Sequence, residues 1–166
     1  MPISKLYRIW KEQIRTIHPT RRITQIQNFA WMMVGIFQSR SVHLSKIAGK
    51  VLSHAKLLST VRRFERFLDN KAIDVRAWCA PIANQWIEAQ WKHLQEIRLI
   101  VDGTKIGFGH QLLMVSLAFR RRSIPIAWGW VKYVRGHSDA QKQIALLEYV
   151  RTLLPKKAVV VLVGDS

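Results

Sequence analysis

Two short apolar runs, each followed by an aspartate, constrain this chain more than any other feature. The first is Arg98-Leu-Ile-Val-Asp-Gly-Thr-Lys105, which contains Asp102. The second is Ala158-Val-Val-Val-Leu-Val-Gly-Asp-Ser166, which contains Asp165. Short apolar runs bounded by turn residues are typical of strands buried on both faces, as in the parallel part of a sheet. We therefore predict two buried strands, 98–102 and 158–164, that run in the same direction.

The segment between the two runs predicts a hairpin and then a helix. Residues 111–119 and 124–133 have the composition of strands, and the polar Arg120-Arg-Arg-Ser123 suits the turn between them. A helix follows to Leu154 and stops at Pro155. Ser138 and Gln141 match its capping box, and its expected buried side is formed by Ala140, Ile144, Leu147 and Leu154.

This order predicts where the two aspartates lie. A strand, a crossover with a helix and a second parallel strand form a right-handed unit, and neighbouring strands lie about 4.8 Å apart. Asp102 and Asp165 would then share the carboxyl edge of the sheet, where open α/β sheets place ligands. Two carboxylates this close stay ionised only if a cation lies between them, so the pattern indicates half of a divalent-metal site. The alternative is that both residues only cap turns.

Charge indicates the class of partner. The net charge of the 166 residues is +17, which favours a polyanion such as nucleic acid or an anionic membrane surface. No apolar run approaches the roughly 18 residues of a membrane span, which argues against a membrane protein. The lone Cys79 permits no internal disulfide and no cysteine-based zinc site, as expected of a protein of the reducing cytoplasm.

The distributions of positive charge and of glycine differ between the front and the back of the chain. Residues 1–95 carry 16 Lys and Arg against 5 Asp and Glu, while residues 96–166 carry 11 against 5. The front part is rich in helix formers, and the back part holds six of the eight glycines. We predict a helical domain over 1–95 and a sheet-containing domain over 96–166.

Within the front part, helical spacing predicts several amphipathic helices. Thr24-Gln-Ile-Gln27 matches a capping box, and Ser41 can cap the next helix. After a break at Ser53-His54, a further helix to Leu68 places Arg62, Arg63 and Arg66 on one face. Two short helices joined by a tight turn, the second with a basic stripe, resemble a helix-turn-helix. The alternative for the stripe is the solvated face of a bundle helix.

Residues 73–95 predict a longer helix that carries Trp78, Trp86 and Trp91, with Pro81 kinking or restarting it. The tryptophans are interpreted as packing.

The triplet Arg120–Arg122 suits either a contact with phosphate or a solvent-exposed turn without a binding role. His137 and Asp139 lie near the expected site, although an aspartate at a helix entry more often serves as a capping or dipole partner.

The order and spacing of these motifs resemble the DDE transposases of bacterial insertion sequences. Val101-Asp-Gly-Thr104 matches the first acidic motif and Val163-Gly-Asp-Ser166 the second, with the two aspartates 63 positions apart. Leu44-Ser-Lys-Ile-Ala48 and Ser59–Leu68 resemble the helical DNA-binding segment that precedes the catalytic core. The resemblance implies an α+β/α/β chain: an N-terminal helical DNA-binding region, then an incomplete RNase H-like mixed sheet ordered strand-strand-strand-helix-strand.

The resemblance also implies an activity. An intact enzyme of this family cleaves phosphodiesters and transfers strands with two Mg²⁺ or Mn²⁺ ions, for which Asp102 and Asp165 would be ligands. Its partner would be double-stranded DNA, namely transposon terminal inverted repeats and target DNA, with a homodimer on the DNA and a nucleoid location in a bacterial cytoplasm. Predicted DNA contacts are Arg62, Arg63, Arg66, Lys105, Arg120, Arg121 and Arg122.

One departure from the family pattern qualifies the expected activity. The family places a third carboxylate, a Glu, after the second motif, and this sequence has none after Asp165. We expect a truncated or split product that binds DNA and cuts poorly or not at all. The alternatives are a non-catalytic DNA-binding regulator and an RNase H-like nuclease or resolvase.

Overall fold

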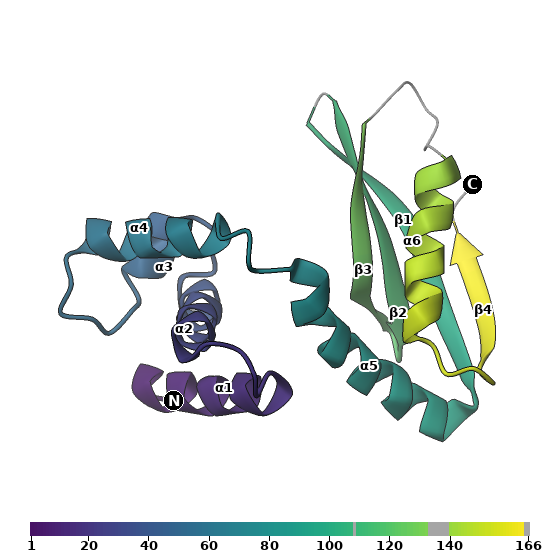
Figure 1. The fold of residues 1–166 in the computed structure, drawn as a ribbon, viewed down its shortest axis with the longest axis horizontal. Helices are drawn as coiled ribbons and strands as arrows, with labels where there is room; N and C mark the ends of the chain where they lie inside the picture. Colours follow the sequence, from purple (N-terminus) through teal and green to yellow (C-terminus); the bar gives the residue numbers. More distant parts are fainter. Residues whose placement is uncertain (108, 133–139, 165–166) are drawn as a thin grey trace. The chain divides into compact units, whose positions relative to one another are not determined.

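The computed structural model describes residues 1–107, 109–132 and 140–164 of the chain (Figure 1). Helices come first, and a mixed four-stranded sheet with one more helix follows, so the chain is α+β. In chain order the elements are α1 (Ile3–Ile17), α2 (Ile23–Ser39), α3 (Leu44–Ala48), α4 (Leu57–Leu68), α5 (Val75–Leu94), β1 (Glu96–Ile106), β2 (His110–Phe119), β3 (Arg122–Lys132), α6 (Ala140–Leu153) and β4 (Val159–Gly164). No helix among the described residues combines the length and the apolar character needed to cross a bilayer.

The chain forms two compact units, Met1–Asp74 and Val75–Ser166. The sequence prediction places the boundary near Glu96 instead, which assigns α5 to the first unit. The structure groups α5 with the sheet because Ala83 and Ile87 of this helix belong to the same buried cluster as the strands. Apolar contact, rather than the change from helical to strand composition, decides where the boundary lies.

The first unit is a small helical assembly in which consecutive helices pack on one another. One cluster of its buried residues consists of Met32, Ile47, Ala48, Phe64 and Phe67. The helices α2 and α3 approach closely at Gly35, where an added Cβ would lie 2.9 Å from the backbone oxygen of Ile47. A residue without a side chain is therefore required at this crossing.

Two local predictions for the first unit are wrong. Thr24 does not cap α2, because the helix begins at Ile23 with Arg22 as its N-cap and makes no side-chain cap hydrogen bond. The helices α3 and α4 are not joined by a tight turn, because α3 ends at Ala48 and residues 49–56 separate it from α4. The short α3 ends where the N–H of Gly49 hydrogen-bonds back to the Ser45 carbonyl oxygen at 3.1 Å.

The second unit contains the sheet, in the order β3-β2-β1-β4. The strands β1, β2 and β3 form an antiparallel meander, and β4 pairs parallel to β1. This confirms the predicted hairpin and the predicted adjacency of the two strands that carry the acidic motifs. The hairpin between β2 and β3 turns at Arg120 and Arg121, with Phe119 opposite Arg122.

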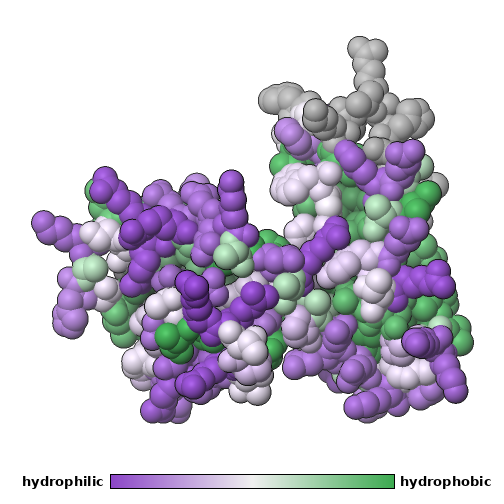
Figure 2. All heavy atoms as spheres, in the orientation of Figure 1, coloured by the Kyte–Doolittle hydropathy of each residue, from purple (hydrophilic) through white to green (hydrophobic). Residues whose placement is uncertain are grey.

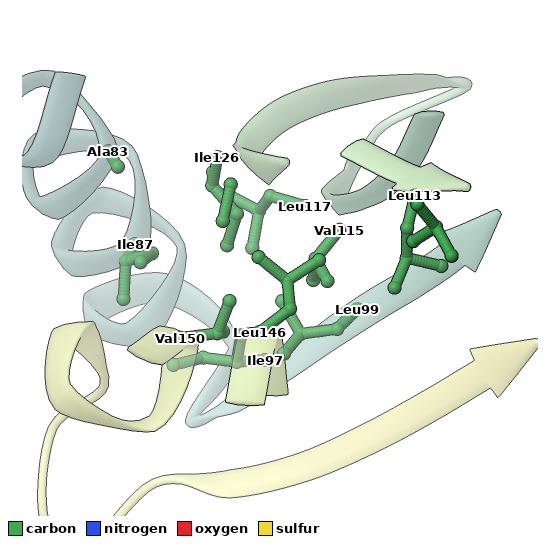
Figure 3. Close-up of a cluster of buried hydrophobic side chains, with 12 residues drawn as sticks. Ala83, Ile87, Ile97, Leu99, Leu113, Val115, Leu117, Ile126, Leu146 and Val150 are labelled. Atoms are coloured by element: carbon green, nitrogen blue, oxygen red, sulfur yellow. The ribbon is translucent and has the colours of Figure 1, made fainter. Parts of the chain in front are cut away.

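Two helices contribute to the core over this sheet. Figure 3 shows Ile87 of α5 and Leu146 and Val150 of α6 gathered with side chains of the strands, among them Leu99 and Leu117. Ile97 and Leu99 are 2 % exposed or less, and they alternate with more exposed neighbours along β1. The alternation shows that β1 buries one face only.

The prediction that both apolar runs are buried on two faces is therefore wrong. Every residue of β4 is exposed, including Leu162 at 51 %. The physical reason is position: β4 is the last strand in the order of the described sheet, and the main contacts of α6 are with β2 and β3. Hydrophobic residues appear along the margin of Figure 2 where Figure 1 draws β4.

The predictions for the two helices of this unit are corrected in part. The predicted inward side of α6 is partly right, because Leu147 and Leu154 are partly buried against the core. Ala140 is exposed and Ile144 is 56 % exposed, and the buried residues of the helix are Leu146 and Val150. Ser138, which was predicted to cap this helix, lies outside the described residues. Pro81 lies inside α5 and does not restart it, because the helix runs without interruption from Val75 to Leu94.

Candidate functional site

The first candidate site is the end of the parallel strand pair. Val101 of β1 lies opposite Gly164 of β4 in the parallel register. Asp102 is the next residue after Val101, and Asp165 is the next after Gly164. Asp165 itself lies outside the described residues, so its position relative to Asp102 stays a prediction.

Asp102 is exposed in β1. The Thr104 hydroxyl donates a hydrogen bond to Asp102 Oδ2 at 3.4 Å, and the two residues are two positions apart on one face of the strand. Among the described residues, no cation forms an ion pair with this carboxylate. A carboxylate with so few partners can accept a metal ion, because most of its lone pairs remain available.

The residues around Asp102 add little further chemistry. Lys105, which was predicted to contact DNA, is exposed in β1 opposite Gln111. His137 and Asp139 lie outside the described residues, as does Phe108. Within the described part of the chain, no three His, Cys, Asp or Glu side chains gather closely enough to hold a metal.

The predicted basic stripe on α4 is split by the structure. Arg62 and Arg66 are exposed, and they share a hollow with Glu65 and Asp69, so acidic groups offset the local positive charge. Arg63 is half-buried, and its Nε and Nη2 atoms are screened from solvent. The guanidinium of Arg63 lies over the Phe64 ring, 5.3 Å from the centroid. The three arginines therefore do not form a single exposed face.

Arg63 is directed toward an aromatic pair inside the first unit. The rings of Tyr7 and Trp31 are stacked with centroids 3.9 Å apart and planes 11° apart. Burial raises the pKa of the Tyr7 hydroxyl, and the nearby positive charge of Arg63 opposes part of this shift because it stabilises the phenolate. Arg63 thus contributes to the packing and electrostatics of the helical unit.

The arginine triplet lies at the hairpin turn between β2 and β3, and all three residues are exposed. Arg120 has a positive φ of 56°, and its guanidinium lies 5.4 Å from the centroid of the Phe119 ring. Within the described residues, none of the three forms an ion pair with a carboxylate. The triplet is thus an available cationic surface at the end of the sheet where β1 begins.

Beside this turn lies a pocket that sequence reasoning did not identify. It has a volume of about 440 Å³ and is bounded by α5 and the end of β2. Trp86 and Phe119 form part of its wall, and Gln90 lies in it. The interpretation of the tryptophans as packing holds for Trp78, which is 4 % exposed, but Trp86 is 39 % exposed. Helical spacing in α5 could not predict the pocket, because the residues on its other side come from the end of β2 and the turn that follows.

Cys79 also lies in the second unit, beside a smaller apolar pocket. Burial raises the pKa of its thiol, so the thiolate that reacts with electrophiles is less populated at neutral pH. Cys79 is thus better interpreted as a small, partly buried packing residue than as a nucleophile.

Comparison with known proteins identifies no relative. No protein-family model, no curated protein and no solved structure matches this chain.

Proposed function

We propose that this chain is a DNA-binding protein of the insertion-sequence transposase type, and that its second unit is an RNase H-like catalytic core. An enzyme of this type would cleave phosphodiesters with divalent metal ions and transfer the resulting strands. The observation that carries the proposal is the parallel pairing of β1 and β4, in which Val101 and Gly164 are opposite and each precedes an aspartate. The element order strand-strand-strand-helix-strand supports the same arrangement.

The proposed metal ligands are Asp102 and Asp165. Asp102 is exposed and accepts one hydrogen bond, from Thr104, so its oxygens suit a hard cation such as Mg²⁺ or Mn²⁺. Bound ions would lower the pKa of the attacking hydroxyl or water and stabilise the leaving oxygen. The residues of this chain would position the ions, and Thr104 would orient the Asp102 carboxylate.

The proposed partner is double-stranded DNA. The net charge of +17 favours a polyanion, and the exposed arginines of α4 and of the β2–β3 turn provide candidate phosphate contacts. Terminal inverted repeats and target DNA are the expected duplexes, and a homodimer is the expected assembly on them. These contacts would set affinity and position, whereas sequence preference would require contacts with base edges.

DNA binding is tested by measuring duplex affinity over a range of salt concentrations. Because bound cationic side chains release counterions, the logarithm of the association constant should fall linearly with the logarithm of salt, with a slope of about −0.9 per phosphate contacted. Replacing Arg121 and Arg122 with Gln should make the slope less steep. An affinity that does not change with salt would contradict the proposal.

The metal site is tested with Asp102→Asn and Mn²⁺ titration followed by electron paramagnetic resonance. We expect the variant to lose Mn²⁺ binding and any plasmid nicking, while duplex affinity stays unchanged. Glu148→Gln, at an exposed position of α6, is the matched control and should retain both Mn²⁺ binding and any nicking. Unchanged Mn²⁺ binding in Asp102→Asn would exclude the proposed ligand.

The same assays separate the alternatives. A preference for a terminal inverted repeat favours a transposase or a regulator derived from one, and weak nicking that Asp102→Asn abolishes then favours the enzyme over the regulator. Nicking without such a preference favours an RNase H-like nuclease or resolvase. Robust nicking by the 166-residue chain would overturn the expectation that it cuts poorly.

A further inference from the structure

The pocket between α5 and the β2–β3 turn contains a buried polar group without a partner. Gln90 is only 4 % exposed, and its side-chain Oε1 atom accepts no hydrogen bond within the described residues. Buried amides in native proteins are nearly always hydrogen-bonded, because an unsatisfied one loses its hydration without compensation. Gln90 also lines a pocket of about 440 Å³. Its Oε1 atom is screened from solvent, so a bound molecule would supply the missing partner once the amide turns toward the pocket.

The walls of this pocket suit a planar ring. Trp86 and Phe119 meet edge to face, with centroids 5.2 Å apart and planes 71° apart. Trp86 remains 39 % exposed, which leaves aromatic surface available to a ligand. A pocket that is mostly apolar, with one buried amide to fix orientation, is typical of sites for small ring systems.

The rim of the pocket carries positive charge. Arg120 lines it, and Arg121 and Arg122 follow directly in the same exposed turn. His93 also lines the pocket and adds a second polar side chain from α5. Cations at the rim and an aromatic wall inside fit a ring that carries an attached anionic group. An aliphatic side chain from a partner protein would leave both the amide and the arginines without a matching group.

We propose that this pocket receives one unpaired nucleobase of a DNA strand. The base lies against Trp86 and Phe119, the Gln90 amide hydrogen-bonds its edge, and the adjoining phosphate lies on the arginines of the turn. An amide carries both a donor and an acceptor, as the edge of every base does. This inference rests on the proposal that the chain binds DNA, and it adds a preference for strands with a base outside the duplex.

The test compares three fluorescein-labelled DNA duplexes by fluorescence anisotropy. One is fully paired, the second has a single bulged thymidine, and the third has an abasic residue in place of that thymidine. Stacking of a base on an aromatic side chain contributes about 1–3 kcal/mol, and about 1.4 kcal/mol corresponds to a factor of ten. We therefore expect the bulged duplex to bind about tenfold more tightly than the paired and abasic duplexes.

The decisive variant is Gln90→Leu, which removes the unsatisfied amide and keeps an apolar side chain of similar length. It should bind all three duplexes with nearly equal affinity, and it should unfold at the same or a higher temperature. Gln85→Leu is the matched control, because Gln85 is an exposed residue of the same helix, and it should keep the preference for the bulge. Trp86→Leu provides a second variant that should also lose the preference.

The outcomes distinguish this inference from the proposed function. Equal binding of all three duplexes by the unmodified chain, or a preference for the bulge that survives in Gln90→Leu or in Trp86→Leu, would refute the base pocket and leave DNA binding intact. Failure to bind even the paired duplex would refute the proposed function, and the base pocket with it.

Discussion

Arg120 combines an unfavourable backbone conformation with a useful location. Its φ of 56° lies in the left-handed region, which glycine and asparagine adopt more readily than a long side chain does. The conformation costs on the order of 1 kcal/mol in a residue of this kind. An arginine at this position places a guanidinium beside Phe119 and at the rim of the pocket.

Replacing Arg120 with Asn should therefore stabilise the fold by about 0.5–1 kcal/mol, because asparagine tolerates positive φ at lower cost. The measurement is the free energy of unfolding from urea denaturation. Arg121→Asn is the control, since Arg121 has no positive φ. An equal gain in the control would show that relief of charge repulsion, rather than backbone strain, explains the effect.

At the scale of the elements, the crossing of α2 and α3 depends on Gly35. A methyl group there would meet the Ile47 backbone oxygen at 2.9 Å, and backbone atoms cannot move aside as a flexible side chain can. Gly35→Ala should destabilise the first unit by about 1–3 kcal/mol, as overpacked cores do. Thermal unfolding followed by far-UV circular dichroism measures the effect.

Gly49→Ala is the matched control for this change. Gly49 has φ −66° and ψ −11°, and its added Cβ would lie 3.5 Å from the nearest atom, which is an ordinary contact. The substitution should be neutral or stabilise by up to about 1 kcal/mol, because alanine restricts the unfolded chain. Similar losses for Gly35→Ala and Gly49→Ala would contradict the proposed role of the crossing.

The parallel strand pair offers a second element-scale test, because two leucines are register partners with opposite burial. Leu99 of β1 is 2 % exposed and Leu162 of β4 is 51 % exposed. Leu99→Ala should cost about 2–5 kcal/mol of unfolding free energy, and Leu162→Ala about 1 kcal/mol or less. Chemical denaturation of the two variants measures the difference. Equal losses would mean that β4 is covered in solution.

At the scale of the whole molecule, the chain consists of two units with separate cores. Phe64 is completely buried in the first and Leu117 in the second. Substitutions at sites that share no contacts act independently.

Phe64→Ala should lower amide protection in α1–α4, and Leu117→Ala should lower it in β1–β3, each by about 2–5 kcal/mol. Hydrogen exchange with mass spectrometry resolves the two regions, and loss of protection across both units in either variant would show that they unfold together.

Local patterns predicted much of the fold. The apolar runs, the polar turn at Arg120–Ser123 and the helical spacing before Leu154 were sufficient to predict the hairpin, the crossover helix and the parallel pairing of the strands. These features follow from short-range sequence because strand pairing and handed connections depend on the order and length of neighbouring elements. The candidate carboxylate Asp102 was predictable for the same reason, since it directly follows an apolar run.

Only the tertiary structure could decide burial and the composition of the pocket. The apolar sequence of β4 does not reveal that it is an edge strand of the described sheet, and the spacing in α6 does not reveal that Leu146 and Val150 are its buried residues. Gln90 and Arg120 are distant in sequence and line one pocket because α5 packs beside the end of β2. The sequence alone determined which elements form and in what order, because those depend on neighbouring residues. Which surfaces are covered, and which polar groups are left without partners, depends on contacts between distant segments and was decided by the packing.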